Sequence, residues 1–195
     1  MDLAGAKPAL SPMELNQKLT SVEFDDTLHP THADTLLKDP ASYQRLIGRL
    51  LYLTTTRSNI SFIVQCLSQF KHSPKTSHMN VALRLVRYMK SAPVLRILMS
   101  LTGGNDLKVF YDADCGACIN SKRSITGYLV QYEGSPISWK SKKQLTIARS
   151  SAKVEYRAMA STVAGVVWIV GLLQKLGVNI SLLVPLYSDN TSALH

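Results

Sequence analysis

The order of apolar segments in the last third of the chain most constrains its fold. Four short apolar runs have the length of strands: residues 107–112, 127–132, 137–140 and 183–188. A longer run with helical periodicity, residues 151–176, lies between the third and the fourth, and Gly177 gives it a stop. A strand–helix–strand crossover makes its two strands parallel. The sequence therefore predicts an α/β domain with a mixed sheet: three antiparallel strands, a crossover helix and a fourth strand parallel to the first.

Three acidic residues stand at the ends of these predicted elements. Asp112 ends the first strand, Glu155 lies in the first turn of the helix, and Asp189 follows the last strand. Open sheets place their sites at the carboxyl ends of strands, so we expect Asp112 and Asp189 side by side with Glu155 within reach. Clustered carboxylates repel one another unless a cation lies among them, and magnesium is the usual cation. The trio is typical of a two-metal phosphodiesterase, whereas any one of these carboxylates alone would more often cap a helix or a turn.

The charge balance favours a polyanionic partner. The chain has 22 Lys and Arg against 13 Asp and Glu, a net charge of +9. Two groups of residues are candidates for phosphate contact: Arg84, Arg87 and Lys90, spaced three apart on a predicted helix, and Lys140, Lys142, Lys143, Arg149 and Ser150, before the long helix. A plain solvated face is the alternative reading of both groups, and it stays open.

The first hundred residues divide into two predicted parts. Residues 1–40 contain several prolines and little periodicity, so we expect an extended arm or linker without a core of its own, able to lie over the folded part. Residues 41–101 carry three helical patterns, the third capped by Thr76 or Ser77, and a short apolar strand near their end. The α/β domain then occupies residues 105–195.

No targeting or membrane segment is predicted. The N-terminus lacks the pattern of a secretory signal, and no run reaches about 18 consecutive apolar residues. We therefore expect an intracellular protein, cytoplasmic or nuclear, with no membrane partner and with Cys66, Cys115 and Cys118 reduced. Cys115 and Cys118 have the spacing of a metal knuckle, but no second pair accompanies them, so zinc or redox chemistry is disfavoured.

Motifs along the chain resemble the C-terminal part of copia-type retrotransposon Pol polyproteins, where reverse transcriptase passes into ribonuclease H. The motifs are residues 43–57, 82–90, Tyr111-Asp-Ala-Asp114, Ser124-Ile-Thr-Gly-Tyr128, 137–144, Arg149-Ser-Ser-Ala152, Glu155-Tyr-Arg-Ala158 and Leu186-Tyr-Ser-Asp-Asn190. Each motif is weak alone, but their order from about residue 43 to residue 195 is specific.

The resemblance implies a ribonuclease H-like fold, truncated at its C-terminal end and preceded by a small helical connection region at residues 41–101. It also implies cleavage of the RNA strand of an RNA–DNA hybrid, with Asp112, Glu155 and Asp189 matching catalytic carboxylates of the family. These three would hold two Mg²⁺ or Mn²⁺ ions. The implied partner is an RNA–DNA hybrid or another nucleic acid, and the oligomeric state is left open.

The chain departs from the family pattern at several points. Cys115 stands where the family usually has Trp, and Lys153 stands where it usually has an additional acidic residue. A fourth metal-binding aspartate is expected beyond the last residue of this sequence. We therefore expect weak or absent nuclease activity, and apolar side chains exposed on one face of the domain. Two alternatives stay open: a nucleic-acid-binding module without chemistry, and a relic with no selected function.

Overall fold

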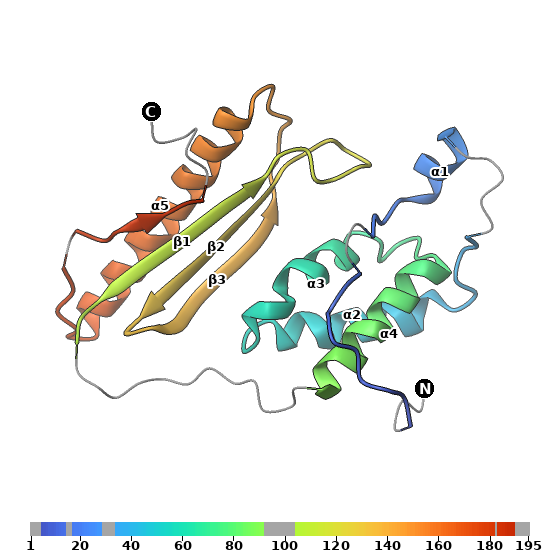
Figure 1. Ribbon diagram of the computed structural model, residues 1–195, viewed down its shortest axis with the longest axis horizontal. Helices are drawn as coiled ribbons and strands as arrows, with labels where there is room; N and C mark the ends of the chain where they lie inside the picture. The colour runs from blue at the N-terminus through green and yellow to red at the C-terminus, as the bar shows by residue number, and fades with distance from the viewer. Residues whose placement is uncertain (1–4, 15–16, 29–33, 92–103, 182, 190–195) are drawn as a thin grey trace. The chain divides into compact units, whose positions relative to one another are not determined.

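The chain folds as two units, each with its own core (Figure 1). The computed structural model describes residues 5–14, 17–28, 34–91, 104–181 and 183–189. The first unit, Met1–Arg96, is helical, and the second, Ile97–His195, holds the sheet. The short strand predicted near residues 95–101 lies outside the described residues.

The helices of the first unit correspond to the three predicted helical patterns. They are α2 (Pro40–Leu53), α3 (Ser61–Ser68), which a single turn η1 (Ser58–Ile60) precedes, and α4 (Thr76–Ser91). α2 begins where the Asp39 side chain accepts hydrogen bonds from two backbone amides, and Pro40 follows at a position that needs no N–H donor. Its buried face includes Tyr43, whose hydroxyl donates to the Leu67 carbonyl oxygen at 2.8 Å. The apolar residues that recur with helical periodicity in the sequence are therefore on the buried faces of these helices.

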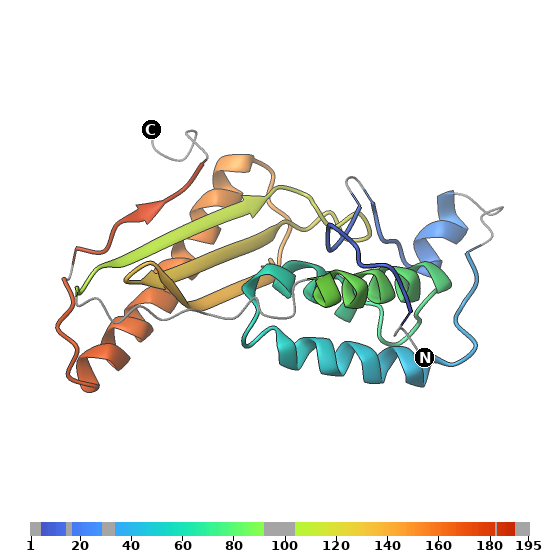
Figure 2. The ribbon, with the colours of Figure 1, turned by 60° about the horizontal axis from the view of Figure 1, so that its bottom comes forward.

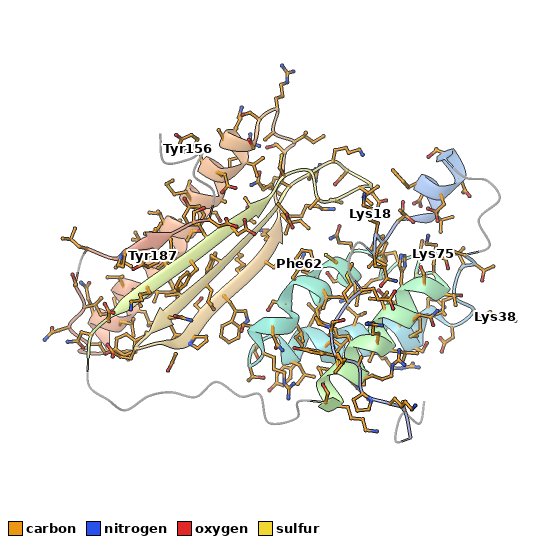
Figure 3. All side chains as sticks on the ribbon, in the orientation of Figure 1. Lys18, Lys38, Phe62, Lys75, Tyr156 and Tyr187 are labelled. Atoms are coloured by element: carbon orange, nitrogen blue, oxygen red, sulfur yellow. The ribbon has the colours of Figure 1, made fainter. Side chains whose placement is uncertain are left out.

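The sequence predicts an arm or linker over residues 1–40; its described residues contain α1 (Val22–Leu28), and Met13, Leu19 and Leu37 pack on these helices. Lys75, at the start of α4, is 2% exposed and forms ion pairs with Asp25 of α1 and with Asp34, the latter at 3.2 Å (Figure 3). Its ammonium group also donates to the Thr20 hydroxyl at 3.1 Å. We call residues 17–28 and 34–37 the arm, and its ion pairs with Lys75 fasten it to the helical unit.

The buried imidazole of His78 adds further contacts between the arm and α4. His78 Nδ1 accepts from the backbone N–H of Lys75 at 3.1 Å, so its Nε2 carries the proton and donates to the Thr20 carbonyl oxygen at 3.1 Å. Its ring stacks on Phe70 with 4.0 Å between centroids. Burial, together with the nearby charge of Lys75, lowers the pKa of His78 to about 4. The imidazole is therefore neutral at physiological pH.

The start of α4 corrects one prediction from the sequence. Thr76 and Ser77 were predicted as caps, but α4 begins at Thr76 itself, and the amide of Ser77 donates to Asp34 Oδ1 at 3.1 Å. The cap therefore comes from the arm, 43 residues earlier in the chain. Residue Leu36 also pairs with Lys75 as an antiparallel bridge, which holds Asp34 in place.

The sheet of the second unit has the mixed topology predicted from the sequence. Its strands are β1 (Leu107–Asp114), β2 (Ile125–Tyr132), β3 (Ser135–Lys143) and β4 (Leu186–Tyr187). They lie in the order β3-β2-β1-β4, with the first three antiparallel and β4 parallel to β1. The α/β fold class with a ribonuclease H-like mixed sheet is therefore confirmed.

Two details of the sheet differ from the sequence expectation. The β2–β3 turn is formed by Glu133 and Gly134, both at positive φ as a tight hairpin requires, whereas the strands predicted at 127–132 and 137–140 leave a longer connection. The final strand is two residues long rather than six. It is an edge strand, and Pro185 before it has no N–H to donate, so the pairing with β1 stays short.

Helix α5 (Ser151–Lys175) covers one face of this sheet (Figures 1 and 2). The Ser150 hydroxyl caps its start by accepting from the Lys153 amide at 3.3 Å, and Gly177, at φ 80°, ends it as predicted. The buried side chains of α5 meet those of β1 and β2: Val109, Val130, Val166 and Ile169 in one cluster, and Tyr111, Ala113, Val154 and Ala158 in the other.

The outward face of α5 exposes apolar side chains, as the sequence led us to expect. Trp168 is 69% exposed and Val167 is 66% exposed. Within the described residues, α5 is the one helix long and apolar enough to cross a membrane by length and composition. Core helices of soluble domains pass the same test, and the inward face of α5 packs on the sheet, so this feature alone assigns no membrane role.

Candidate functional site

The pairing of β1 with β4 precedes two of the predicted carboxylates. Val109 lies opposite Leu186, and Phe110 lies opposite Tyr187. Asp112 and Asp189 each follow this last paired position by two residues along the chain. Both aspartates are exposed. We call Asp112 and Asp189 the aspartate pair.

Asp112 belongs to the face of the sheet that α5 does not cover. Along β1, side chains alternate between the two faces, and Tyr111 and Ala113 pack toward α5. Asp112, between them, points to the other face, the one on which Phe110 stacks against Tyr187. Its Oδ1 accepts a hydrogen bond from the Ala113 amide at 2.6 Å. This contact orients the carboxylate and leaves its second oxygen for other donors or a cation.

The third predicted carboxylate, Glu155, is buried, unlike the exposed aspartate pair. It is 2% exposed near the start of α5, next to Val154, which packs on the covered face of the sheet. Among the described residues, no group of three or more His, Cys, Asp or Glu side chains is arranged to hold a metal ion. The structure therefore does not gather Glu155, Asp112 and Asp189 into a three-carboxylate metal site.

The aspartate pair by itself has donors suited to a hard divalent cation. Magnesium is commonly held by one or two carboxylates together with water and substrate phosphates. Asp112 and Asp189 supply carboxylate oxygens from two strands on an exposed surface that a phosphate can approach. The residues present therefore fit a magnesium ion that is shared with a substrate.

Several basic residues line a pocket between α5 and β3, the edge strand, on the side of the sheet away from Asp112. This pocket, which we call the β3–α5 pocket, has a volume of about 260 Å³. Its lining comprises Thr126, Tyr128, Lys140, Lys142, Lys143, Gln144, Leu145, Thr146, Arg157 and Ser161. Four of these residues are basic and none is acidic. Three of the sequence-predicted lysines thus converge on one concave surface.

Sequence reasoning missed Arg157 as a member of this pocket and included two residues that do not line it. Arg149 is exposed outside the pocket, and Ser150 caps α5. Arg157 is separated from the lysines by more than a dozen positions and gives no spacing signal, so only the packing of α5 beside β3 reveals it. It donates from Nη1 to the Thr146 carbonyl oxygen at 3.4 Å.

The basic stripe predicted on α4 contacts the N-terminal segment of its own unit. Arg84 donates to Glu14 at 2.7 Å and to the Ser11 hydroxyl at 3.1 Å. Lys90 donates to the Ala6 carbonyl oxygen at 3.3 Å, and the Arg87 carbonyl oxygen accepts from the Ala9 amide. These contacts give the stripe a structural role that the sequence did not suggest, and its contact with phosphate stays a prediction.

The cysteines of the second unit lie in the β1–β2 connection. Cys115 is exposed and Cys118 is buried, and neither forms a disulfide bond within the described part of the chain. Burial raises the pKa of Cys118, but hydrogen bonds from Ser121 and the charge of Lys143 outweigh this, so its pKa is lowered overall. Neither cysteine belongs to a metal-binding group among the described residues.

Comparison with known proteins identifies long relatives. The chain is 36% identical over 190 residues to the retrovirus-related Pol polyprotein from transposon RE2 and 35% identical to that from transposon RE1, both of Arabidopsis thaliana. It is 31% identical over 196 residues to the corresponding polyprotein from transposon TNT 1-94 of Nicotiana tabacum. These matches cover 97% to 99% of this chain, which spans only 12% to 14% of the length of the relatives. No protein-family model and no solved structure matches the chain.

Proposed function

The chain belongs, as a fragment, to the Pol polyproteins of copia-type retrotransposons, and on this premise we propose that its second unit binds an RNA–DNA hybrid and hydrolyses the RNA strand. The observation that supports this proposal is the parallel pairing of β1 and β4, because the exposed Asp112 and Asp189 each follow its last paired position by two residues. Two aligned carboxylates at strand ends are costly without a cation, and a phosphodiester with its magnesium ion removes that cost.

Each group of this unit has a role in the proposal. Asp112 and Asp189 hold a divalent ion, Mg²⁺ or Mn²⁺, which when bound would activate water and neutralise charge on the scissile phosphate. The Ala113 amide keeps Asp112 oriented. Glu155 is the third carboxylate of the proposal, and it is buried in α5. The aspartate pair therefore carries the first binding step.

The test is cleavage of an end-labelled RNA–DNA hybrid in Mg²⁺ or Mn²⁺. We expect cleavage by the unaltered chain to be lost in Asp112→Asn and in Asp189→Asn. The matched control is Asp106→Asn, which removes the same charge just before β1, where Asp106 pairs with Lys108 at 3.1 Å. Retained cleavage in Asp112→Asn, or no cleavage by a chain that circular dichroism shows to be folded, would contradict hydrolysis.

A second candidate function is nucleic-acid binding without chemistry. It is favoured by the finding that the described residues do not assemble a three-carboxylate group, although a basic pocket is present. The measurement that separates the two is binding of the hybrid in EDTA, where hydrolysis cannot proceed. Tight, salt-dependent binding without cleavage in Mg²⁺ or Mn²⁺ supports this second function.

A further inference from the structure

We propose that the β3–α5 pocket is a sugar-phosphate anchor, which holds one backbone phosphate of the bound strand at a distance from the aspartate pair. This inference rests on the proposed function, because it takes nucleic acid as the ligand. It adds a second point of attachment, built from Lys142, Arg157 and Ser161, to the reactive end of the sheet.

The charge of the pocket selects an anion. Lys140, Lys142, Lys143 and Arg157 line it, and no carboxylate does. Among the described residues, no salt bridge joins Lys140, Lys142 or Arg157 to an acidic side chain. Like charges that converge without a counter-charge repel one another, and a bound phosphate removes that repulsion.

The pocket is held in shape by hydrogen bonds that do not use up its donors. Gln144 Nε2 donates to the Thr126 hydroxyl at 3.0 Å and to the Val154 carbonyl oxygen at 3.1 Å, which ties the end of β3 to α5. Arg157 uses one N–H on the Thr146 carbonyl oxygen. A guanidinium has five N–H donors, so a forked contact with a phosphate remains open to Arg157. Ser161, one helical turn later, adds a hydroxyl on the same face of α5.

Two further lining residues, Leu145 and Tyr128, add apolar surface to the pocket, which favours a sugar-phosphate over a free anion. Leu145 lies at the mouth and is 78% exposed, and the Tyr128 ring forms part of the wall. An exposed leucine at a basic pocket offers packing surface for a ribose or deoxyribose ring. A free inorganic phosphate would leave this surface in water.

The sheet register places the pocket at the same end of the sheet as the aspartate pair. Ala113 of β1 pairs with Thr126 of β2, and Thr126 pairs with Lys142 of β3. Adjacent strands lie about 4.8 Å apart, so Lys142 lies about 10 Å across the sheet from the position next to Asp112. The two sites therefore lie at the same end of the sheet, on opposite faces of it.

The test is binding of a fluorescein-labelled RNA–DNA hybrid in EDTA, followed by anisotropy at several salt concentrations. The pocket variant is Lys142→Gln with Arg157→Gln. The matched control is Lys153→Gln with Lys175→Gln, which removes the same two charges from α5 outside the pocket. We expect the pocket variant to bind at least tenfold more weakly and the control less than threefold. The slope of log affinity against log salt concentration should decrease in magnitude by about 1 in the pocket variant and stay unchanged in the control.

A second measurement separates failure of the anchor from failure of the proposed function. Sodium pyrophosphate added to the ¹⁵N-labelled full chain should shift the amide signals of Leu145, Thr146 and Ser161. The single variant Lys142→Gln, at an exposed strand position, should abolish these shifts and keep the rest of the spectrum unchanged. If the unaltered chain fails to bind the hybrid but shows these shifts, the proposed function is wrong and the anion site stands.

Three results would overturn the anchor. The first is the absence of pyrophosphate shifts at the pocket. The second is equal loss of hybrid affinity in the pocket variant and the control. The third is a pair of findings: phosphatidylserine vesicles bind the unaltered chain but not the pocket variant, and the two chains bind the hybrid with equal affinity. This result would assign the pocket to a membrane surface.

Discussion

Phe110 of β1 and Tyr187 of β4 stack with 5.2 Å between their ring centroids and 22° between their planes. The two residues are also partners in the parallel register of the strands. Because β4 is only two residues long, this stack contributes much of the side-chain contact that fixes its position. Asp112 and Asp189 follow two residues later along the chain, so we expect the aromatic pair to influence the relative position of the two carboxylates.

The first prediction concerns this stack. Tyr187→Ala should lower the affinity for Mg²⁺ at least fivefold, because β4 loses its register, while the free energy of unfolding falls by only about 1 kcal/mol. Mg²⁺ titration monitored by NMR and urea unfolding measure the two effects. Tyr156→Ala, which removes a similarly exposed tyrosine from α5, is the control and should leave Mg²⁺ affinity unchanged (Figure 3). Equal Mg²⁺ affinities in both variants would show that the stack does not position the aspartates.

The second prediction ranks the three carboxylates. Asp112→Asn and Asp189→Asn should each weaken Mg²⁺ binding at least tenfold, because each removes a charged ligand of the exposed pair. Glu155→Gln should weaken it less than threefold, because Glu155 is buried away from the pair. Isothermal titration calorimetry without nucleic acid gives all three affinities. A loss in Glu155→Gln as large as that in Asp112→Asn would mean that the three carboxylates bind the ion together from the start.

The third prediction concerns the buried ion pairs of the first unit. Lys75→Met should destabilise this unit by about 3 kcal/mol, because Asp25 and Asp34 lose their cation in a partly buried setting. It should also release the arm, which limited proteolysis would detect as faster cleavage within residues 17–37. Lys38→Met, at an exposed position, should change neither quantity. Unchanged proteolysis in Lys75→Met would show that apolar contacts alone hold the arm.

The fourth prediction is a pH dependence of stability. The pKa of His78 is about 4 in the folded chain and near 6.5 in the unfolded chain, so the unfolded state binds the proton first as the pH falls. The contribution of His78 to the free energy of unfolding is therefore complete above about pH 6.5 and is lost progressively down to about pH 4. A shift of this size corresponds to about 3 kcal/mol.

Urea unfolding at pH 7 and pH 5 measures this effect. His78→Gln should flatten the dependence, because the titrating group is gone. The exposed His72 provides the control, since His72→Gln should leave the dependence intact. A pH dependence that survives in His78→Gln would assign it to other groups.

The sequence alone indicated the main helices and strands of both units and their order, but neither helix α1 nor the short length of β4. Helix α5 begins at the Ser150 cap and ends at Gly177, and both signals are local to the chain. The parallel orientation of β4 followed from the crossover rule, which depends only on the order of strand and helix. Such features are readable because backbone periodicity and capping involve residues within a few positions of one another.

Only the tertiary structure decided which side chains meet. Asp34 caps a helix that begins 42 positions later, and Arg157 joins Lys142 in one pocket, because chain segments distant in sequence are packed together. Glu155 was expected beside the aspartates, yet the pleat turns Asp112 to the uncovered face while α5 buries Glu155 on the other side. Sequence order places a residue at the end of an element, but the packing of elements fixes the face and the neighbours of its side chain, and these decide its chemistry.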